Sequence, residues 1–188
     1  GTHRLTLGAL VGALAAAALV YLISMAQGGM TPLRLVLSGV VLSSAFSALA
    51  SFLVFRSPDP RAAQSVLFWM LGSVAGATWD SLWVAALVTV VIAVLMIAFS
   101  GWLDALAAGT DVARSLGIPD TRVRKALFVG NSVLVGVLVA VSGGIGFVGL
   151  VIPHMARLLV GASHRSMLPI AAGVGSLFLL WVDVGARV

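Results

Sequence analysis

The charged residues of this chain are few, and they gather in one short segment, residues 104–125, which reads DALAAGTDVARSLGIPDTRVRK. The segment holds four of the eleven basic residues and three of the six acids. Side chains of both signs beside short apolar stretches suit recognition of another protein. We therefore expect a soluble partner to bind this segment, which we call the polar insert.

Motifs for covalent chemistry are missing from the sequence. There is no G-x-x-x-x-G-K-[ST] loop for ATP, no H-E-x-x-H and no G-x-S-x-G. The histidines His3, His154 and His164 are not spaced as a metal cluster, and there is no cysteine. These patterns predict a protein that is not an enzyme and that carries no cofactor and no metal.

The composition indicates a membrane protein. The chain is 61% hydrophobic and only 9% charged, with a mean hydropathy of +1.15. Soluble domains carry roughly a quarter charged residues, so a water-soluble surface could not be covered here. The net charge of +5 rests on few residues, and we interpret these as topology signals, with no nucleic-acid role.

Uncharged runs predict an all-α, polytopic transmembrane helical bundle with short coupling helices. About 20 apolar residues are needed to cross a bilayer. Residues 126–156 are too many for one span, so we expect two passes broken at Gly143 and Gly144. Residues 62–79 are interrupted by glycines and predict a surface or re-entrant segment. The six expected spans are Leu5–Met25, Leu35–Phe55, Ser81–Leu103, the two halves of Ala126–Ala156, and Ser166–Val182.

Loop charges predict the orientation, because Lys and Arg in short loops favour the cytoplasm. One set of alternating loops holds seven basic residues, and the other set holds four. The bias places the polar insert inside the cell and the loop with Arg56 and Arg61 outside. The inner set is Arg34, Arg114, Arg122, Arg124, Lys125, Arg157 and Arg165, and the outer set is Arg4, Arg56, Arg61 and Arg187.

The polar insert predicts two short helices joined by a turn. The first ends at Gly109, Thr110 is expected to cap the second, and Gly117 is expected to end it. Asp120 and Thr121 are expected to cap the helix that follows. Two interpretations stay open: a solvated loop that only fixes topology, or a docking element with a small apolar face. We favour the docking element, whose apolar face is Val112, Ala113 and Leu116.

Two further segments are candidates for a pore or gate. Residues 142–161 are rich in glycine and predict a broken helix, with Gly146 and Gly149 as a close-packing face and Pro153 as a kink. The span Leu35–Phe55 carries a mild polar stripe that includes Ser43 and Ser47. Tight packing explains the glycines equally simply, and helix–helix hydrogen bonds explain the serines about as well as a pore does.

Several stretches resemble the FecCD-type permeases, the membrane subunits of ABC importers for ferric siderophores, haem and cobalamin. The most specific is Gly144–Leu168, GIGFVGLVIPHMARLLVGASHRSML, where Ser163 stands at a position at which the family often has Asp. Ala105–Gly117 is similar to the family's coupling segment. Further matches are Leu37–Leu53, Gln64–Trp79 and Leu179–Arg187, so the resemblance covers essentially the whole chain.

The resemblance implies a larger protein than this chain. Family subunits have about ten spans, work as dimers, and assemble with two cytoplasmic ATPases and an external binding protein. Residues 1–188 would be a partial transmembrane permease domain covering roughly spans four to nine. By similarity, the ATPase-coupling residues would be Gly109, Asp111, Arg114, Leu116 and Gly117, and the binding-protein docking residue would be Arg187, with Arg56 and Arg61 on the same side.

The expected function is therefore that of a permease subunit in the bacterial inner membrane, taking up iron-siderophore, haem or cobalamin-type chelates. Its expected partners are ABC ATPase subunits, a substrate-binding protein, a second permease subunit and the lipid bilayer. Two alternatives remain at this point. A secondary, ion-coupled transporter would need intramembrane ionisable residues, which are scarce here. A membrane scaffold would not transport at all.

Overall fold

The computed structural model describes residues 2–29, 31–58, 60–74 and 77–187, and every regular element within those ranges is an α-helix, which confirms the predicted fold class. The helices are α1 (Thr2–Ala26), α2 (Pro32–Arg56), α3 (Pro60–Leu71), α4 (Trp79–Ala98), α5 (Ser100–Ala108), α6 (Thr110–Ser115), α7 (Asp120–Ser142), α8 (Val148–Val160) and α9 (His164–Arg187).

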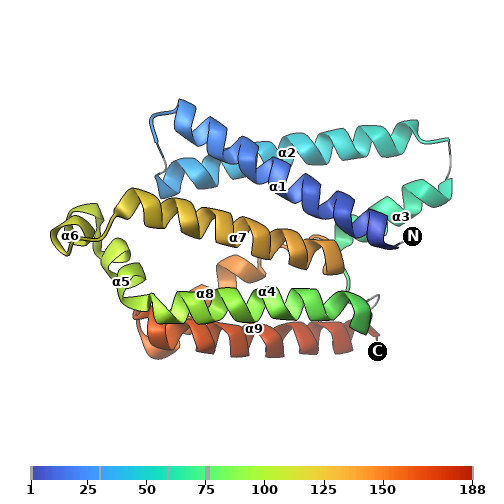
Figure 1. Cartoon of the computed structure of the whole chain (residues 1–188). Helices are drawn as coiled ribbons and strands as arrows, with labels where there is room; N and C mark the ends of the chain where they lie inside the picture. Colours follow the sequence, from blue (N-terminus) through green and yellow to red (C-terminus); the bar gives the residue numbers. More distant parts are fainter. Residues whose placement is uncertain (1, 30, 59, 75–76, 188) are drawn as a thin grey trace.

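The long helices run side by side, with α7 between α1 and α4 (Figure 1). Helix α9 packs against α4 and α8, and α2 contacts α1 and α3. Large apolar side chains nevertheless cover the outside of the bundle, and on α2 the side chains of Leu33 and Val41 are each 68% exposed. Such a surface suits lipid, because hydrocarbon chains solvate apolar side chains while each helix satisfies its own backbone.

The connections fall into two groups at opposite ends of the bundle. Figure 1 shows the α1–α2 connection and the α5–α6 pair at one end, and both chain termini together with α3 at the other. This separation matches the two sets of loops that the charge tally distinguished. The polar insert therefore lies at the end that the sequence predicts to face the cytoplasm.

Within the part of the chain that the structure describes, fewer spans than the six expected can be counted. Among the residues described, three helices are long and apolar enough, namely Pro32–Arg56, Asp120–Ser142 and His164–Ala186. A fourth span arises if α4 and α5 count as one bent pair. The break after Ser142 is confirmed, but α8 has 13 residues and so is too short for a complete pass. Helix α1 itself has 25 residues, Thr2–Ala26, and only its part Leu10–Ala26 counts among the shorter apolar helices.

Helices α4 and α5 meet at Phe99 with a bend of 65°. Phe99 has φ −98° and ψ 19°, outside the helical region, which ends the regular backbone of α4. The centre of its ring lies 5.2 Å from the centre of the Trp102 ring, so the two aromatic side chains pack against each other beside the corner. The bend turns the chain away from the bundle axis and leads it into the polar insert.

Candidate functional site

The turn after α6 is built by two backbone hydrogen bonds. The amide of Ile118 donates to the carbonyl of Ala113 at 3.0 Å, and the amide of Gly117 donates to that of Arg114 at 2.9 Å. This pair of bonds defines a Schellman motif, which requires a left-handed residue just after the helix. Gly117 supplies it with φ 72°. The predicted end of the second short helix is thereby confirmed.

A small apolar cluster holds the insert together. Ala105 of α5, Ala113 of α6 and Ile118 of the following turn are buried, and Leu106 and Val123 pack against them. Ala113 has no exposed surface, so its placement on an outward apolar face was wrong. Val112 and Leu116 do point outward, with 43% and 66% of their surfaces exposed. The outward apolar face is therefore these two side chains.

Polar contacts fix the insert against α7. The guanidinium of Arg114 donates to both carboxylate oxygens of Asp120, from Nε at 3.1 Å and from Nη2 at 3.4 Å. Arg124 donates from Nη2 to the hydroxyl of Thr110 at 3.1 Å. A bidentate arginine–carboxylate pair has defined geometry, so Arg114 is held in one orientation although it is largely exposed.

Two of the expected helix caps were wrong. Gly109, with φ 132°, occupies the N-cap position of α6, and Thr110 is the first helical residue. The hydroxyl of Thr110 instead accepts from Arg124. Pro119 occupies the N-cap position of α7, and the carboxylate of Asp120 accepts a hydrogen bond from Arg114. In both places a contact with a neighbouring element replaces the local cap.

The structure brings the five predicted coupling residues into one compact element. Asp111, Arg114 and Leu116 are exposed on α6 and its C-cap, while Gly109 and Gly117 form its two turns. We call the exposed side chains of Asp111, Val112, Arg114 and Leu116 the α6 surface. It combines one acid, one fixed base and two apolar groups, a mixture that suits contact with another protein.

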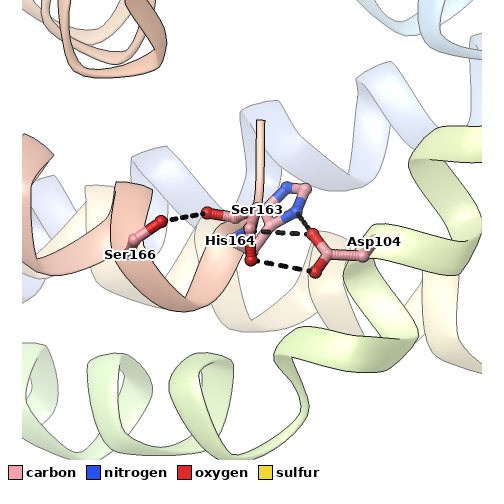
Figure 2. Close-up of polar contacts among 4 residues, drawn as sticks. All are labelled: Asp104, Ser163, His164 and Ser166. Atoms are coloured by element: carbon pink, nitrogen blue, oxygen red, sulfur yellow. Dashed lines mark hydrogen bonds and ion pairs between the residues drawn. The ribbon is translucent and has the colours of Figure 1, made fainter. Parts of the chain in front are cut away.

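One polar cluster in this region was not predicted from the sequence. Asp104 of α5 faces the beginning of α9, where Oδ1 accepts from the His164 amide at 2.8 Å and Oδ2 accepts from the Ser163 hydroxyl at 3.3 Å (Figure 2). The imidazole Nδ1 of His164 lies 2.5 Å from Oδ1. The contact joins residues 60 positions apart, so no local pattern could reveal it.

At the other end of the bundle, glycines let two chain segments meet. The amide of Ser73 donates to the carbonyl of Ser142 at 2.7 Å, just after α3 and at the end of α7. A Cβ added to Gly72 would lie 2.6 Å from the carbonyl oxygen of Gly144, and one added to Gly143 would collide with that of Trp69. Both glycines also have positive φ. We call this contact the α3–α7 junction.

The predicted pore and gate residues are not gathered at one place. Gly146 lies between α7 and α8, and Gly149 and Pro153 lie within α8. A Cβ on Gly146 or Gly149 would meet no atom within 4 Å, so the described helices of this chain do not make the expected close packing. Ser43 and Ser47 are exposed on α2.

Two cavities are lined by residues other than the predicted pore and gate residues. One, of about 310 Å³, is lined by side chains of α1 and α7, including Tyr21, Lys125 and Phe128. The other, of about 300 Å³, lies between α7 and the α4–α5 corner and is lined in part by Phe99 and Trp102. Because both are almost wholly apolar, neither by itself identifies a path for a polar cargo.

The predicted docking residues lie at the end opposite the polar insert. The guanidinium carbon of Arg56 lies 5.8 Å from the centre of the Phe52 ring, and Arg61 lies in the first turn of α3. Arg187 ends α9, but its side chain lies outside the described residues. Among the described residues, no group of three or more His, Cys, Asp or Glu could hold a metal ion.

A bundle of apolar helices with one compact polar element at one end is the architecture of a multi-pass membrane protein. Comparison with known proteins specifies the class further. The model of the FecCD transport family matches residues 1–188, and the chain belongs to this family.

Curated relatives are permease proteins of import systems. The chain is 37% identical over 179 residues to the cobalamin import system permease protein BtuC of Halobacterium salinarum, covering 95% of this chain and 48% of the relative. It is 36% identical over 189 residues to the iron(3+)-hydroxamate import system permease protein FhuG of Bacillus subtilis, covering 100% and 55%. It is 37% identical over 170 residues to the molybdate import system permease protein MolB of Haemophilus influenzae, covering 90% and 50%.

A solved structure has the same fold. The inward-facing conformation of a protein described as a metal-chelate type ABC transporter superposes with a TM-score of 0.83 at 34% identity, over 97% of this chain and 62% of that one. The chain thus spans about half the length of the curated relatives it matches.

Proposed function

We propose that the complete protein is the membrane-spanning permease subunit of an ABC importer, driven by separate ATPase subunits. The observation that carries this proposal is the α6 surface, displayed at one end of a chain that the transport family matches throughout. Permeases of this class need no nucleotide site of their own, and the sequence has no P-loop motif. The polar insert would be the element through which the ATPase moves the helices.

The insert has the properties that a force-transmitting contact requires. Its apolar cluster and the Arg114–Asp120 pair make it one packed unit with the start of α7. Its exposed apolar side chains, Val112 and Leu116, would fill a depression on the partner, and Asp111 and Arg114 would set the orientation. A loosely held loop would absorb the partner's motion, whereas a packed unit passes it on.

The rest of the assembly follows from the same proposal. The insert would lie in the cytoplasm of a bacterial cell, and Arg187, Arg56 and Arg61 would face an external substrate-binding protein. A second permease subunit would complete the pore, to which the region around Ser43, Ser47, Gly146, Gly149 and Pro153 would contribute. Charge reversal at Arg187 in the full-length protein should weaken capture of the binding protein, and added salt should reduce the difference from wild type.

For the cargo we propose a bulky metal chelate of the siderophore, haem or cobalamin type. Relatives named for cobalamin and iron(3+)-hydroxamate import, at 37% and 36% identity, support this class. The relative named for molybdate import is equally similar, at 37%, so overall identity does not select one cargo. Uptake of labelled cobalamin, ferric hydroxamate, haem and molybdate in a strain lacking the full-length gene would discriminate them.

The similarities favour an ABC importer over both alternatives considered from the sequence. An ion-coupled carrier would not need an exposed, packed docking element beside the bilayer, and a membrane scaffold would show no ATP-dependent uptake. All three of the relatives described above are permeases of import systems. A carrier would also transport without any ATPase subunit, and this difference can be measured directly in reconstituted vesicles.

The decisive experiment replaces Arg114 and Leu116 together by alanine in the full-length protein. Association with the ATPase subunits and ATP-dependent uptake should both fall by roughly tenfold or more, because anchors at the centre of an interface each contribute more than 1 kcal/mol. Membrane insertion should stay normal. Unchanged association and uptake would refute the proposed coupling role.

A matched control places the same two changes elsewhere at the same end of the bundle. Leu33 and Arg34 begin α2 beside the α1–α2 connection, and Leu33 is 68% exposed. The double variant Leu33→Ala with Arg34→Ala should retain ATPase association. Equal losses in both variants would mean that general charge and apolarity, and not the α6 surface, account for the result.

A further inference from the structure

The polar insert touches α9 as well as α7, through the Asp104 carboxylate. Asp104 lies on α5, and its two oxygens divide between two groups at the beginning of α9, the amide of His164 and the hydroxyl of Ser163 (Figure 2). The imidazole of His164 contacts the same carboxylate. We call these three residues the α5–α9 clamp.

The clamp satisfies a need at the start of α9. The first amides of a helix have no partner within the helix, and a negative charge there is favourable. Helix α9 has no acidic residue in its own first turn. The carboxylate of Asp104 therefore provides from another helix what an N-terminal acid would provide from within. The hydroxyl of Ser163 also donates to Asp104, so the same carboxylate joins α5 to the start of α9 by two hydrogen bonds.

The clamp lies where a displacement of the polar insert would be transmitted to α9. Helix α5 begins at the 65° corner with α4 and leads directly into α6. Helix α9 has 24 residues, so at 1.5 Å per residue it extends about 36 Å from the clamp toward the opposite end of the bundle. A displacement of the insert would thus reach the far end through α9, in addition to reaching α7 through the Arg114–Asp120 pair.

We propose that Asp104 is a positioning residue that fastens the polar insert to the beginning of α9, so that the insert and α9 move as one body. This inference rests on the proposed function, because the displacement is assumed to come from an ATPase bound at the α6 surface. Asp104 itself does not touch the ATPase. Its loss should leave ATPase binding intact and reduce the transport obtained per ATP hydrolysed.

The geometry also predicts which pairs of residues can form the clamp. An aspartate at position 163 would place a second carboxylate next to that of Asp104, and like charges at this distance repel. An asparagine at position 104 would remove the repulsion. Its amide oxygen can accept from His164, and its amide nitrogen can donate to the new carboxylate. Ser163→Asp should therefore be harmful alone and tolerated together with Asp104→Asn.

The test uses the full-length protein reconstituted with its ATPase subunits. In Asp104→Ala and in Ser163→Asp, ATPase association should equal wild type, while transport per ATP should fall by roughly tenfold or more, the loss typical of a hydrogen bond to a charged group. The double variant Asp104→Asn with Ser163→Asp should recover most of the loss. Ser166→Ala serves as the control, because among the described residues its hydroxyl donates to the Ser163 carbonyl, just before α9, and not to Asp104.

A distance measurement separates a mechanical role from a merely stabilising one. Spin labels at Ala108 of α5 and Ala172 of α9, both exposed, should give the same narrow distance distribution with and without ATP in wild type. The distribution should broaden or shift with ATP in Asp104→Ala. Unchanged distances, or unchanged transport per ATP, in Asp104→Ala would overturn the inference, as would failure of the double variant to recover. Absence of ATPase binding in wild type would instead refute the proposed function.

Discussion

The polar insert and the α3–α7 junction both depend on glycines, but in different ways. In the insert, Gly117 adopts positive φ in open space, where an added Cβ would meet no atom within 4 Å. In the junction, Gly72 and Gly143 combine positive φ with direct backbone contact between remote segments. The insert is thus specified by neighbouring residues, whereas the junction exists only when two distant parts of the chain meet.

The difference predicts how well each region tolerates a side chain in place of its glycine. A local turn tolerates a side chain at the cost of backbone strain, since neighbouring atoms do not obstruct it. A close backbone contact tolerates none, because the segments must separate to admit even one methyl group. Mutations at the three glycines should therefore rank clearly, and the ranking tests whether the two regions are built as described.

The largest effect is expected for Gly143→Ala in the full-length protein. The methyl group would collide with the Trp69 carbonyl, and the residue would keep an unfavourable φ of 71°. We expect a loss of about 3 kcal/mol in the free energy of unfolding. Thermal or chemical unfolding in detergent would measure it. Gly173→Ala, in α9 with no atom within 4 Å of the new methyl group, is the control and should not destabilise the protein.

An intermediate effect is expected for Gly117→Ala. Only the backbone conformation is unfavourable there, with φ 72° and no steric contact. We expect a loss of about 1 kcal/mol, measured by the same unfolding assay. A loss as large as that of Gly143→Ala would contradict the distinction between the two regions.

The smallest effect is expected for Asp120→Asn, which weakens the pair with Arg114. The Arg114 side chain is 63% exposed, so solvent and salt screen the attraction. We expect a loss of stability below that of Gly117→Ala, disappearing at about 1 M salt, where the screening length is only about 3 Å. Unfolding at low and high salt would reveal it. A loss that persists at high salt would show that shape, and not charge, connects the insert to α7.

The sequence predicted those parts of the insert that depend on neighbouring residues. Gly109 and Gly117 follow the ends of its two short helices as expected, because glycine is the residue that most easily adopts positive φ. Its two cap predictions failed because Thr110 and Asp120 bond to arginines. A capping residue and an arginine partner look identical in a sequence, since each needs only a short polar side chain.

The remaining contacts depend on residues far apart in the chain. Asp104 and His164 meet only because α5 and α9 pack together, and Gly72 meets Gly144 only because α3 returns to the end of α7. Hydropathy gave the all-helical fold but overestimated the number of complete spans, because it cannot distinguish a 13-residue helix flanked by apolar linker from a full crossing. The family resemblance identified Ala105–Gly117 as similar to the family's coupling segment, and the structure shows which side chains of this segment are exposed.

The 65° corner at Phe99 has a mechanical consequence. A straight rod pressed at its tip slides along its own axis, but a bent rod pressed on its short arm experiences a torque about the elbow. Helix α5 is the short arm and α4 the long one. A partner that pushes α5 toward the membrane should therefore tilt α4. A tilt of α4 should widen the bundle at one end and narrow it at the other.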